Sequence, residues 1–269
     1  MKAIKLKSFV LIIFLTTSLF ALDSAFASKR RTLVIAGDYW CPYNCHPDSK
    51  MPGYLVELAT RALHIYKIDI EYRMMPWTKA LKEVKKGNID AVIGLTDFEG
   101  NGLQTTRVAL EYTQSSAFTR TDSKWVYDGV RSLTRKKLGI IIGYAQSEEI
   151  NNYIGMNYIT KPDLFVMEGG KNAVIDSIAN LIDGDIDVCI GDRRVFNHYI
   201  KENGLEPYIR EAGKIDKIKH PLYIAFSPKT LHIDQYIKCL EEGLAALKAT
   251  GEDDYLRQKY KISRKEHDL

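Results

Sequence analysis

Apolar runs of strand length alternate with segments of helical period along most of the chain. Residues 32–37 (TLVIAG) and 138–143 (LGIIIG) are apolar and end in glycine, which is typical of buried strands. Residues 54–66 place apolar side chains at helical spacing, and residues 68–74 alternate as a strand does. Strands that alternate with helices predict an α/β fold with open sheets.

One part of this pattern occurs twice. GNIDAVIG at residues 87–94 and GDIDVCIG at residues 184–191 each follow a helix-patterned run. The first glycine ends the helix in the left-handed conformation, and Asp90 or Asp187 lies in the turn before the strand. Because ligands of open α/β sheets bind where strands end, two such units predict two similar lobes that face each other across a cleft. The alternative is that any α/β protein repeats helix–glycine–strand joints.

The N-terminus has the pattern of an export signal. Lysines in the first seven residues precede an apolar run at residues 8–22, and Ala25-Phe26-Ala27 offers a cleavage site. We expect residues 1–27 to be a signal peptide that is removed near Ala27; the alternative is a retained membrane anchor. No later segment could span a bilayer, and no cysteine lies at the cleavage site for lipidation. These features predict a free protein of the bacterial periplasm.

Composition and charge narrow the class of protein. Hydrophobic residues make up 45% and charged residues 27% of the 269, as in ordinary globular proteins. Loss of residues 1–27 removes three lysines and one aspartate from a formal charge of +4, which leaves the chain nearly neutral. No basic stripe remains, so we expect no nucleic-acid partner.

The cysteines predict a disulfide rather than a metal site. Cys41 and Cys45 flank a Pro-Tyr-Asn turn and are close enough to bridge in an oxidising compartment. The alternative is a metal site that includes His46, but a second ligand pair is missing. Cys189 and Cys239 are expected to behave as small buried hydrophobes. We expect neither a metal nor a cofactor.

Candidate ligand contacts gather at predicted strand ends and helix starts. Tyr39, Trp40 and Tyr43 lie in the loop after the first strand. Trp77 begins the helix-patterned run that precedes the first repeated motif. Core packing is the usual role of aromatic side chains, but at a strand end flat rings can stack on a ligand. Trp77 fits the core and the rim of the cleft equally well.

A second candidate contact follows residues 138–143. Gln146 or Ser147 is the expected N-cap of a helix, whose free backbone N–H groups suit an anionic group. Glu148 and Glu149 in its first turn already complement the helix dipole and would weaken that attraction.

Four stretches resemble the extracellular solute-binding proteins of family 3, the periplasmic components of amino-acid importers. They are GDYWCPYN, PGYLVELATRAL, PWTKALKEVKKGNIDAVIG and ALKATGEDDYLRQKY, and the likeness covers most of residues 32–262. The resemblance implies a two-lobed, type II periplasmic-binding-protein-like fold. Lobe 1 would comprise residues 32–118 and 223–269, and lobe 2 residues 119–222, with hinges near residues 118–124 and 219–224.

The resemblance also implies roles for single residues. Trp40 takes the place of a stacking aromatic, and Asp192 is similar to the aspartate that binds the ligand's ammonium group, although it could instead pair with Arg193 or Arg194.

The carboxylate-binding segment departs from the family. A Thr-x-Glu-Arg motif is replaced by Thr96-Asp97-Phe98-Glu99-Gly100, and a Gly-Thr-Thr loop by Gly143-Tyr144-Ala145-Gln146. The nearest arginine, Arg107, either replaces the missing one or lies on the surface.

The predicted function is capture of a small polar solute, an amino acid or a related small carboxylate, for the membrane permease of an ABC importer by a monomer. The solute would be enclosed by Trp40, Tyr43, Phe118, Arg107, Gln146 and Asp192. One alternative is an exported enzyme similar to cyclohexadienyl dehydratases, with Glu168 and Asp97 as candidate acid/base carboxylates. Another is a ligand sensor that acts through a separate membrane receptor.

Overall fold

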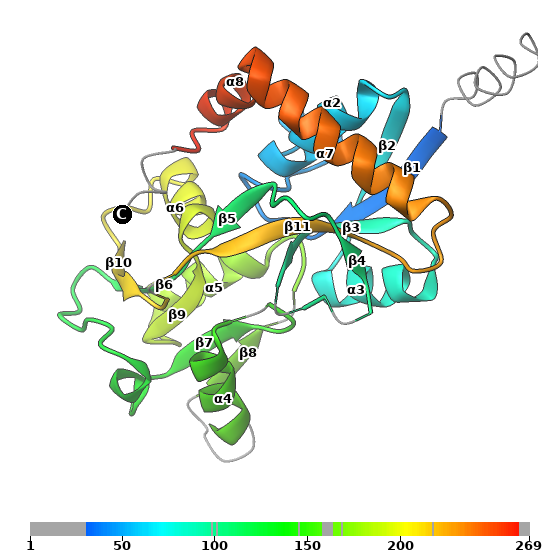
Figure 1. Cartoon of the computed structure of the whole chain (residues 1–269). Helices are drawn as coiled ribbons and strands as arrows, with labels where there is room; N and C mark the ends of the chain where they lie inside the picture. Colours follow the sequence, from blue (N-terminus) through cyan, green and yellow to red (C-terminus); the bar gives the residue numbers. More distant parts are fainter. Residues whose placement is uncertain are drawn as a thin grey trace, which may run out of the picture.

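The computed structural model describes residues 31–97, 99–100, 102–144, 146–157, 164–167, 169–216 and 218–263. The expected signal peptide and Glu168 lie outside these residues. The described segments form two β-sheets, each flanked by helices (Figure 1). The two copies of the repeated motif belong to different sheets, as the two-lobed prediction requires.

The first sheet has the strand order β2-β1-β3-β11-β4, with β5 also paired to β11. Its strands are β1 (Arg31–Gly37), β2 (Ile68–Met74), β3 (Ala91–Thr96), β4 (Gln104–Thr105), β5 (Glu111–Thr113) and β11 (His220–Phe226). β1, β2 and β3 run parallel, whereas β11 is antiparallel to β3.

The second sheet repeats this plan, with the order β10-β6-β9-β7-β8. Its strands are β6 (Ser115–Arg120), β7 (Leu138–Ile141), β8 (Leu164–Met167), β9 (Val188–Asp192) and β10 (Ile209–Lys214). β8, β7 and β9 run parallel and β6 is antiparallel to β9. Reading β2-β1-β3-β11 beside β8-β7-β9-β6 gives the same sequence of strand directions, so the two lobes share one architecture.

Helices cover both sheets. They are α2 (Tyr54–His64), α3 (Trp77–Lys86), α4 (Glu148–Asn157), α5 (Ala173–Asp183), α6 (Arg193–Glu202), α7 (Ile233–Thr250) and α8 (Glu252–Lys259), with a 3-10 turn at Val130–Leu133. α2 and the long α7 pack together over the first sheet (Figure 1). Leu55 and Leu63 of α2 are fully buried there, and each such side chain contributes about 1.5 to 3 kcal/mol to folding.

The repeated glycines end helices as predicted. Gly87 follows α3 with φ 79° and Gly184 follows α5 with φ 82°, the left-handed conformation that suits glycine. Each lets the chain turn directly from a helix into the strand that it covers.

The repeated aspartates fasten those turns to the neighbouring strand. Oδ2 of Asp90 accepts the N–H of Val34 at 2.8 Å, and Oδ2 of Asp187 accepts the N–H of Lys137 at 3.0 Å. Because Val34 lies in β1 and Lys137 directly precedes β7, the two bonds are equivalent in the two lobes. The aspartates of the repeat are therefore structural.

The chain changes sheet at Gln114 and again within residues 215–219. β6 pairs with β9 from its first residue, Ser115, so the first change of sheet falls a few residues before the boundary expected at 118. β11 belongs entirely to the first sheet, so the return also precedes the expected boundary at 222. The Gln114 side-chain amide donates to the Asp216 carbonyl at 2.9 Å and holds the two crossing segments side by side.

Within the described residues, no helix combines the length and the apolar character that a membrane span requires.

Candidate functional site

A cleft of about 690 Å³ lies between the two lobes. Residues of both sheets and of the loops at their strand ends line it: Asp38, Trp40, Asn44, Trp77, Ile93, Gly94, Thr96, Glu99, Thr113, Ser115, Tyr144, Gln146, Ser147, Gly191, Asp192, Asp216 and His220. Gly94 and Gly191, the closing glycines of the two repeated motifs, are among them. The strand ends therefore meet at one site, as the repeated motif predicts.

Two equivalent loops touch each other across the cleft. Asp38 follows β1 in lobe 1, and Tyr144 follows β7 in lobe 2. The Tyr144 hydroxyl donates to Oδ2 of Asp38 at 2.8 Å. The pKa of Asp38 is raised above its usual 3.8 because the carboxyl is buried, although hydrogen bonds from Tyr144 and Tyr39 act in the opposite direction. This contact links the two lobes across the cleft.

Gly143 allows that contact. Its φ is 82°, and a Cβ added there would lie 2.4 Å from Cγ2 of Thr78 on the opposite lobe. A larger residue would push this loop away from α3.

Asp192 stands where β9 ends and α6 begins. Its Oδ1 caps α6 by accepting the N–H of Val195 at 2.8 Å, and its Oδ2 accepts the hydroxyl of Thr113. The side chain is buried, and burial raises the pKa of Asp192, against the effect of both hydrogen bonds and of the Arg194 charge. These hydrogen bonds fix the carboxylate in place beside the cleft that it lines.

Glu99 is a second fixed carboxylate, on the lobe 1 side. The indole N–H of Trp77 donates to its Oε1 at 2.7 Å, and the Thr96 hydroxyl donates to its Oε2 at 2.9 Å. The bond also fixes the Trp77 ring, which is buried in the core of lobe 1 and lines the cleft.

Asp216 and His220 line the side of the cleft where the chain returns to lobe 1. Nε2 of His220 lies 3.5 Å from Oδ2 of Asp216, and its Nδ1 lies 3.7 Å from Oδ1 of Asp97. Burial raises the pKa of Asp216, while His220 and the Ser147 hydroxyl favour its charged form.

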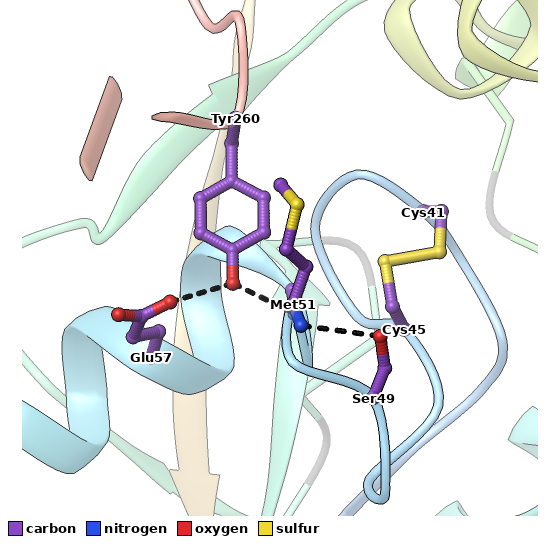
Figure 2. Close-up of a disulfide and its surroundings, with 7 residues drawn as sticks. Cys41, Cys45, Ser49, Met51, Glu57 and Tyr260 are labelled. Atoms are coloured by element: carbon purple, nitrogen blue, oxygen red, sulfur yellow. Dashed lines mark hydrogen bonds between the residues drawn. A yellow bond between two sulfur atoms is a disulfide. The ribbon is translucent and has the colours of Figure 1, made fainter. Parts of the chain in front are cut away.

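The disulfide lies in the loop that carries Trp40. Cys41 and Cys45 are bonded, and the backbone of Trp40 pairs with that of Asn44 across the turn. Figure 2 shows this loop beside α2, where the Tyr260 hydroxyl donates to Oε2 of Glu57 at 2.7 Å. The disulfide and the backbone pairing thus close this loop on itself next to the C-terminal helix. They fix the backbone of Trp40, whose side chain lines the cleft.

The structure brings six of the predicted ligand residues to the cleft: Trp40, Trp77, Thr96, Gln146, Ser147 and Asp192. Ser147 directly precedes α4, and the Ile150 N–H approaches its hydroxyl at 3.4 Å.

The other predicted ligand residues do not line it. Tyr39 contacts Tyr199 edge to face, with 6.2 Å between ring centroids. Tyr43 is fully buried behind the cleft, and Phe118 stacks on Phe196 in the core of lobe 2. Asp97 is exposed beside His220.

Arg107 lies away from the cleft. Its side chain is exposed in a surface groove of lobe 1, and its backbone N–H donates to Oε1 of Glu241 on α7 at 2.6 Å. Of the two alternatives for this arginine, its position fits the surface one, because the segment after β4 runs along α7.

Several lining residues were not predicted as ligand contacts: Asp38, Asn44, Glu99, Tyr144, Asp216 and His220. The signal for Asp38 and Tyr144 was present, because each is the residue after a strand-ending glycine. Asp216 and His220 carried no local signal, since only the return of the chain to lobe 1 brings them there.

The chain offers no metal centre within its described ranges: no three His, Cys, Asp or Glu side chains gather in a metal-binding arrangement there. Of the two carboxylates considered for acid/base chemistry, Asp97 lies outside the cleft lining and Glu168 outside the described residues.

Solved structures share this two-lobed fold. A histidine kinase sensor domain with similarity to periplasmic binding proteins is 21% identical with a TM-score of 0.70, over 86% of this chain and 96% of that one. A mutant of ArgBP from T. maritima is 17% identical with a TM-score of 0.71, over 87% and 96%. The L-arginine-bound substrate-binding protein AbpA of an amino acid ABC transporter from Streptococcus pneumoniae is 17% identical with a TM-score of 0.67, over 88% and 97%.

No curated protein matches the chain. The family described as bacterial extracellular solute-binding proteins, family 3, matches residues 33–263. That span contains both sheets apart from the first two residues of β1, and it contains every residue that lines the cleft. The chain is therefore a member of solute-binding protein family 3.

Proposed function

We propose that this protein is the exported substrate-binding component of an ABC importer, which encloses a small polar solute between its lobes as a monomer and delivers it to a membrane permease. The observation that carries the proposal is the cleft, which takes its lining from both lobes and is bridged by the Tyr144–Asp38 hydrogen bond. The family consists predominantly of non-enzymatic binding proteins, which supports binding rather than turnover.

Solute recognition would use the fixed groups of the cleft. Asp192 would accept hydrogen bonds from an amino group, and the Trp40 and Trp77 rings would pack against the body of the solute. Gln146 and Ser147 would contribute from the start of α4. The position of Arg107 gives no support to the role of carboxylate clamp considered for it.

Capture would proceed by a hinge motion. The lobes are joined by two short segments, Gln114 and residues 215–219, which are tied together by the Gln114–Asp216 bond. Rotation about such a pair of crossings opens and closes a cleft with little change inside either lobe. A solute that contacts both lobes stabilises the closed form by its differential affinity for it.

The test is native mass spectrometry of protein purified without denaturation, followed by release and identification of any bound small molecule. A bound solute at unit stoichiometry, which raises the melting temperature when it is added back, is the expected result. Absence of a bound molecule together with no thermal shift across amino acids, amines, sugars and small carboxylates would contradict the proposal.

The likeness to a histidine kinase sensor domain favours a second candidate function, a ligand sensor that acts through a separate membrane receptor. Solute uptake into proteoliposomes that contain the cognate permease, dependent on this protein, distinguishes transport from sensing.

A further inference from the structure

The cleft has an excess of negative charge. Asp38 and Glu99 line it from lobe 1, Asp192 lines it from lobe 2, and Asp216 lines it from the segment that returns to lobe 1. Among the lining residues that the structure describes, none is a lysine or an arginine, and His220 is the sole group that could carry a positive charge. Carboxylates therefore outnumber possible cations by about four to one.

Three side-chain donors of the cleft are directed at these carboxylates. The Tyr144 hydroxyl donates to Asp38, and the Trp77 indole donates to Glu99. The Thr113 hydroxyl donates to Asp192. Donors that already serve the protein's own carboxylates are not available to a second set of carboxylate oxygens on a solute.

Two hydrogen-bond acceptors of the cleft-lining residues have no partner in the described part of the chain. Oε1 of Gln146 and Oδ1 of Asn44 are buried without a hydrogen-bond partner in the described part of the chain, and both residues line the cleft. The exposed fractions of the two residues are 4% and 2%. The Asn44 amide nitrogen donates to the Ile93 carbonyl at 3.1 Å, which leaves its oxygen facing elsewhere. Unpaired buried acceptors call for a ligand that donates hydrogen bonds.

Aromatic rings complete the environment. Trp40 and Trp77 line the cleft from lobe 1 and Tyr144 lines it from lobe 2. The face of an aromatic ring attracts a cation electrostatically, and indole does so best.

Building on the proposed binding function, we infer that the solute is a cationic amine or guanidine that carries no carboxylate. An ammonium group would find carboxylates and aromatic rings among the lining residues, whereas a carboxylate would be desolvated among four like charges with His220 as the sole possible cation of the described lining. Because the carboxylates stand on both lobes, a cation between them also relieves their mutual repulsion and favours closure.

The experiment compares amino acids with the amines that differ from them only by the missing carboxylate. Lysine and cadaverine, arginine and agmatine, tyrosine and tyramine, and tryptophan and tryptamine are titrated by calorimetry into protein freed of bound solute by unfolding and refolding. We expect at least one amine to bind on the order of 100-fold more tightly than its own amino acid.

An amino acid that binds as tightly as its amine, or more tightly, overturns the inference and leaves the proposed binding function standing. The same holds if no amine binds and the co-purified molecule is neutral or anionic. If no compound binds and nothing co-purifies, both the inference about the amine and the proposed binding function fail.

A matched pair of variants assigns the effect to the cleft. Asp192→Asn keeps a residue that caps helices well but removes the charge, and should weaken the amine on the order of 100-fold. Asp122→Asn removes an aspartate of lobe 2 whose side chain is 81% exposed, and should leave amine affinity unchanged. Equal affinities of the Asp192 variant and the unaltered protein would overturn the inference; circular dichroism checks that both variants fold.

Discussion

The cleft and the ion network directly behind it use the same side-chain chemistry in opposite ways. In the network, Glu111 of β5 accepts from both Arg194 of α6 and Arg257 of α8, and Arg257 also binds Asp253. The Glu111 side chain is fully buried, yet two carboxylates face two guanidinium groups and the charges balance. In the cleft, carboxylates stand without arginine or lysine among the described lining residues.

The difference separates a structural site from a binding site. A buried charge that is paired within the protein needs nothing further, and the network fixes the hinge side of the lobes to each other and to the C-terminal helix. The cleft carboxylates, which no arginine or lysine of the described lining balances, would be compensated further by a cationic solute. The imbalance of charge, rather than the number of charged residues, is what distinguishes the proposed binding site.

The largest expected effect is on the network. Glu111→Gln leaves Arg194 and Arg257 without their shared carboxylate, and loss of one partner of a buried ion pair costs about 3 to 5 kcal/mol of unfolding free energy. Urea denaturation measures this. Glu71→Gln is the control, because it breaks the Glu71–Arg73 pair of half-exposed side chains at a cost below about 1 kcal/mol. Similar losses of unfolding free energy in the two variants would show that the buried ion network stabilises the fold no more than a surface ion pair does.

In the cleft, pH is expected to act through Asp38 and Asp192. Burial raises both pKa values above 3.8, so these carboxylates protonate sooner than exposed ones as the pH falls. An alkylammonium stays charged throughout, so calorimetry from pH 7 to pH 4 should show amine affinity falling by about tenfold for each unit below the raised pKa of a contacting carboxylate.

The ligand-free protein should respond in the opposite direction. A raised carboxyl pKa contributes stability that is present at low pH and is lost as the pH rises through that pKa, so these two groups favour folding on the acid side. The thermal shift that an amine produces should therefore shrink in acid. A shift that grows in acid would show that these carboxylates do not contact the ligand.

Tyr144→Phe tests the contact between the lobes. It removes a hydrogen bond to a carboxylate, which is worth about 1.5 to 3 kcal/mol, so ligand affinity should drop roughly 10-fold to 150-fold if the bond forms only on closure. Small-angle scattering should show a larger radius of gyration for the free variant. Tyr66→Phe also removes a tyrosine–carboxylate bond, to Glu242 at 3.1 Å, but within lobe 1, and should change neither quantity.

The smallest effect is expected from loss of an aromatic ring that lines the cleft. Trp40→Leu keeps an apolar side chain but removes the ring, which costs about 0.5 to 2 kcal/mol of cation–π attraction, or roughly 2-fold to 30-fold in amine affinity. Trp125→Leu is the matched control, because that indole packs in the core of lobe 2 and donates to the Ser132 carbonyl. Equal changes in the two variants would place Trp40 outside the ligand contacts.

Much of the architecture could be predicted from the sequence because its causes are local. The strand at residues 68–74 and the glycine stops at Gly87 and Gly184 follow from periodicity and from the conformational freedom of one residue type. The pairing of Cys41 with Cys45 followed from a spacing of four residues. The doubled motif indicated two lobes because each copy carries the same glycine stop, the same aspartate in the turn and the same short strand.

The site was predicted only in part, because its composition depends on which loops meet. Trp40 was identified through its place after a strand and Asp192 through the family resemblance, whereas the aromatic side chains of Tyr43 and Phe118 are buried in the cores. No local pattern distinguishes an aromatic side chain that faces a cleft from one that faces the layer beneath it.

By itself the sequence determined the doubled α/β plan, its helix stops and the strand ends at which a ligand would bind, since these depend on neighbours along the chain. The tertiary structure alone decided the charge of the cleft. Arg194 is drawn into the network with Glu111 and Arg257, while Arg107 lies beside α7. Electrostatic balance depends on distances between residues far apart in sequence, and those distances exist only once the two lobes have been placed against each other.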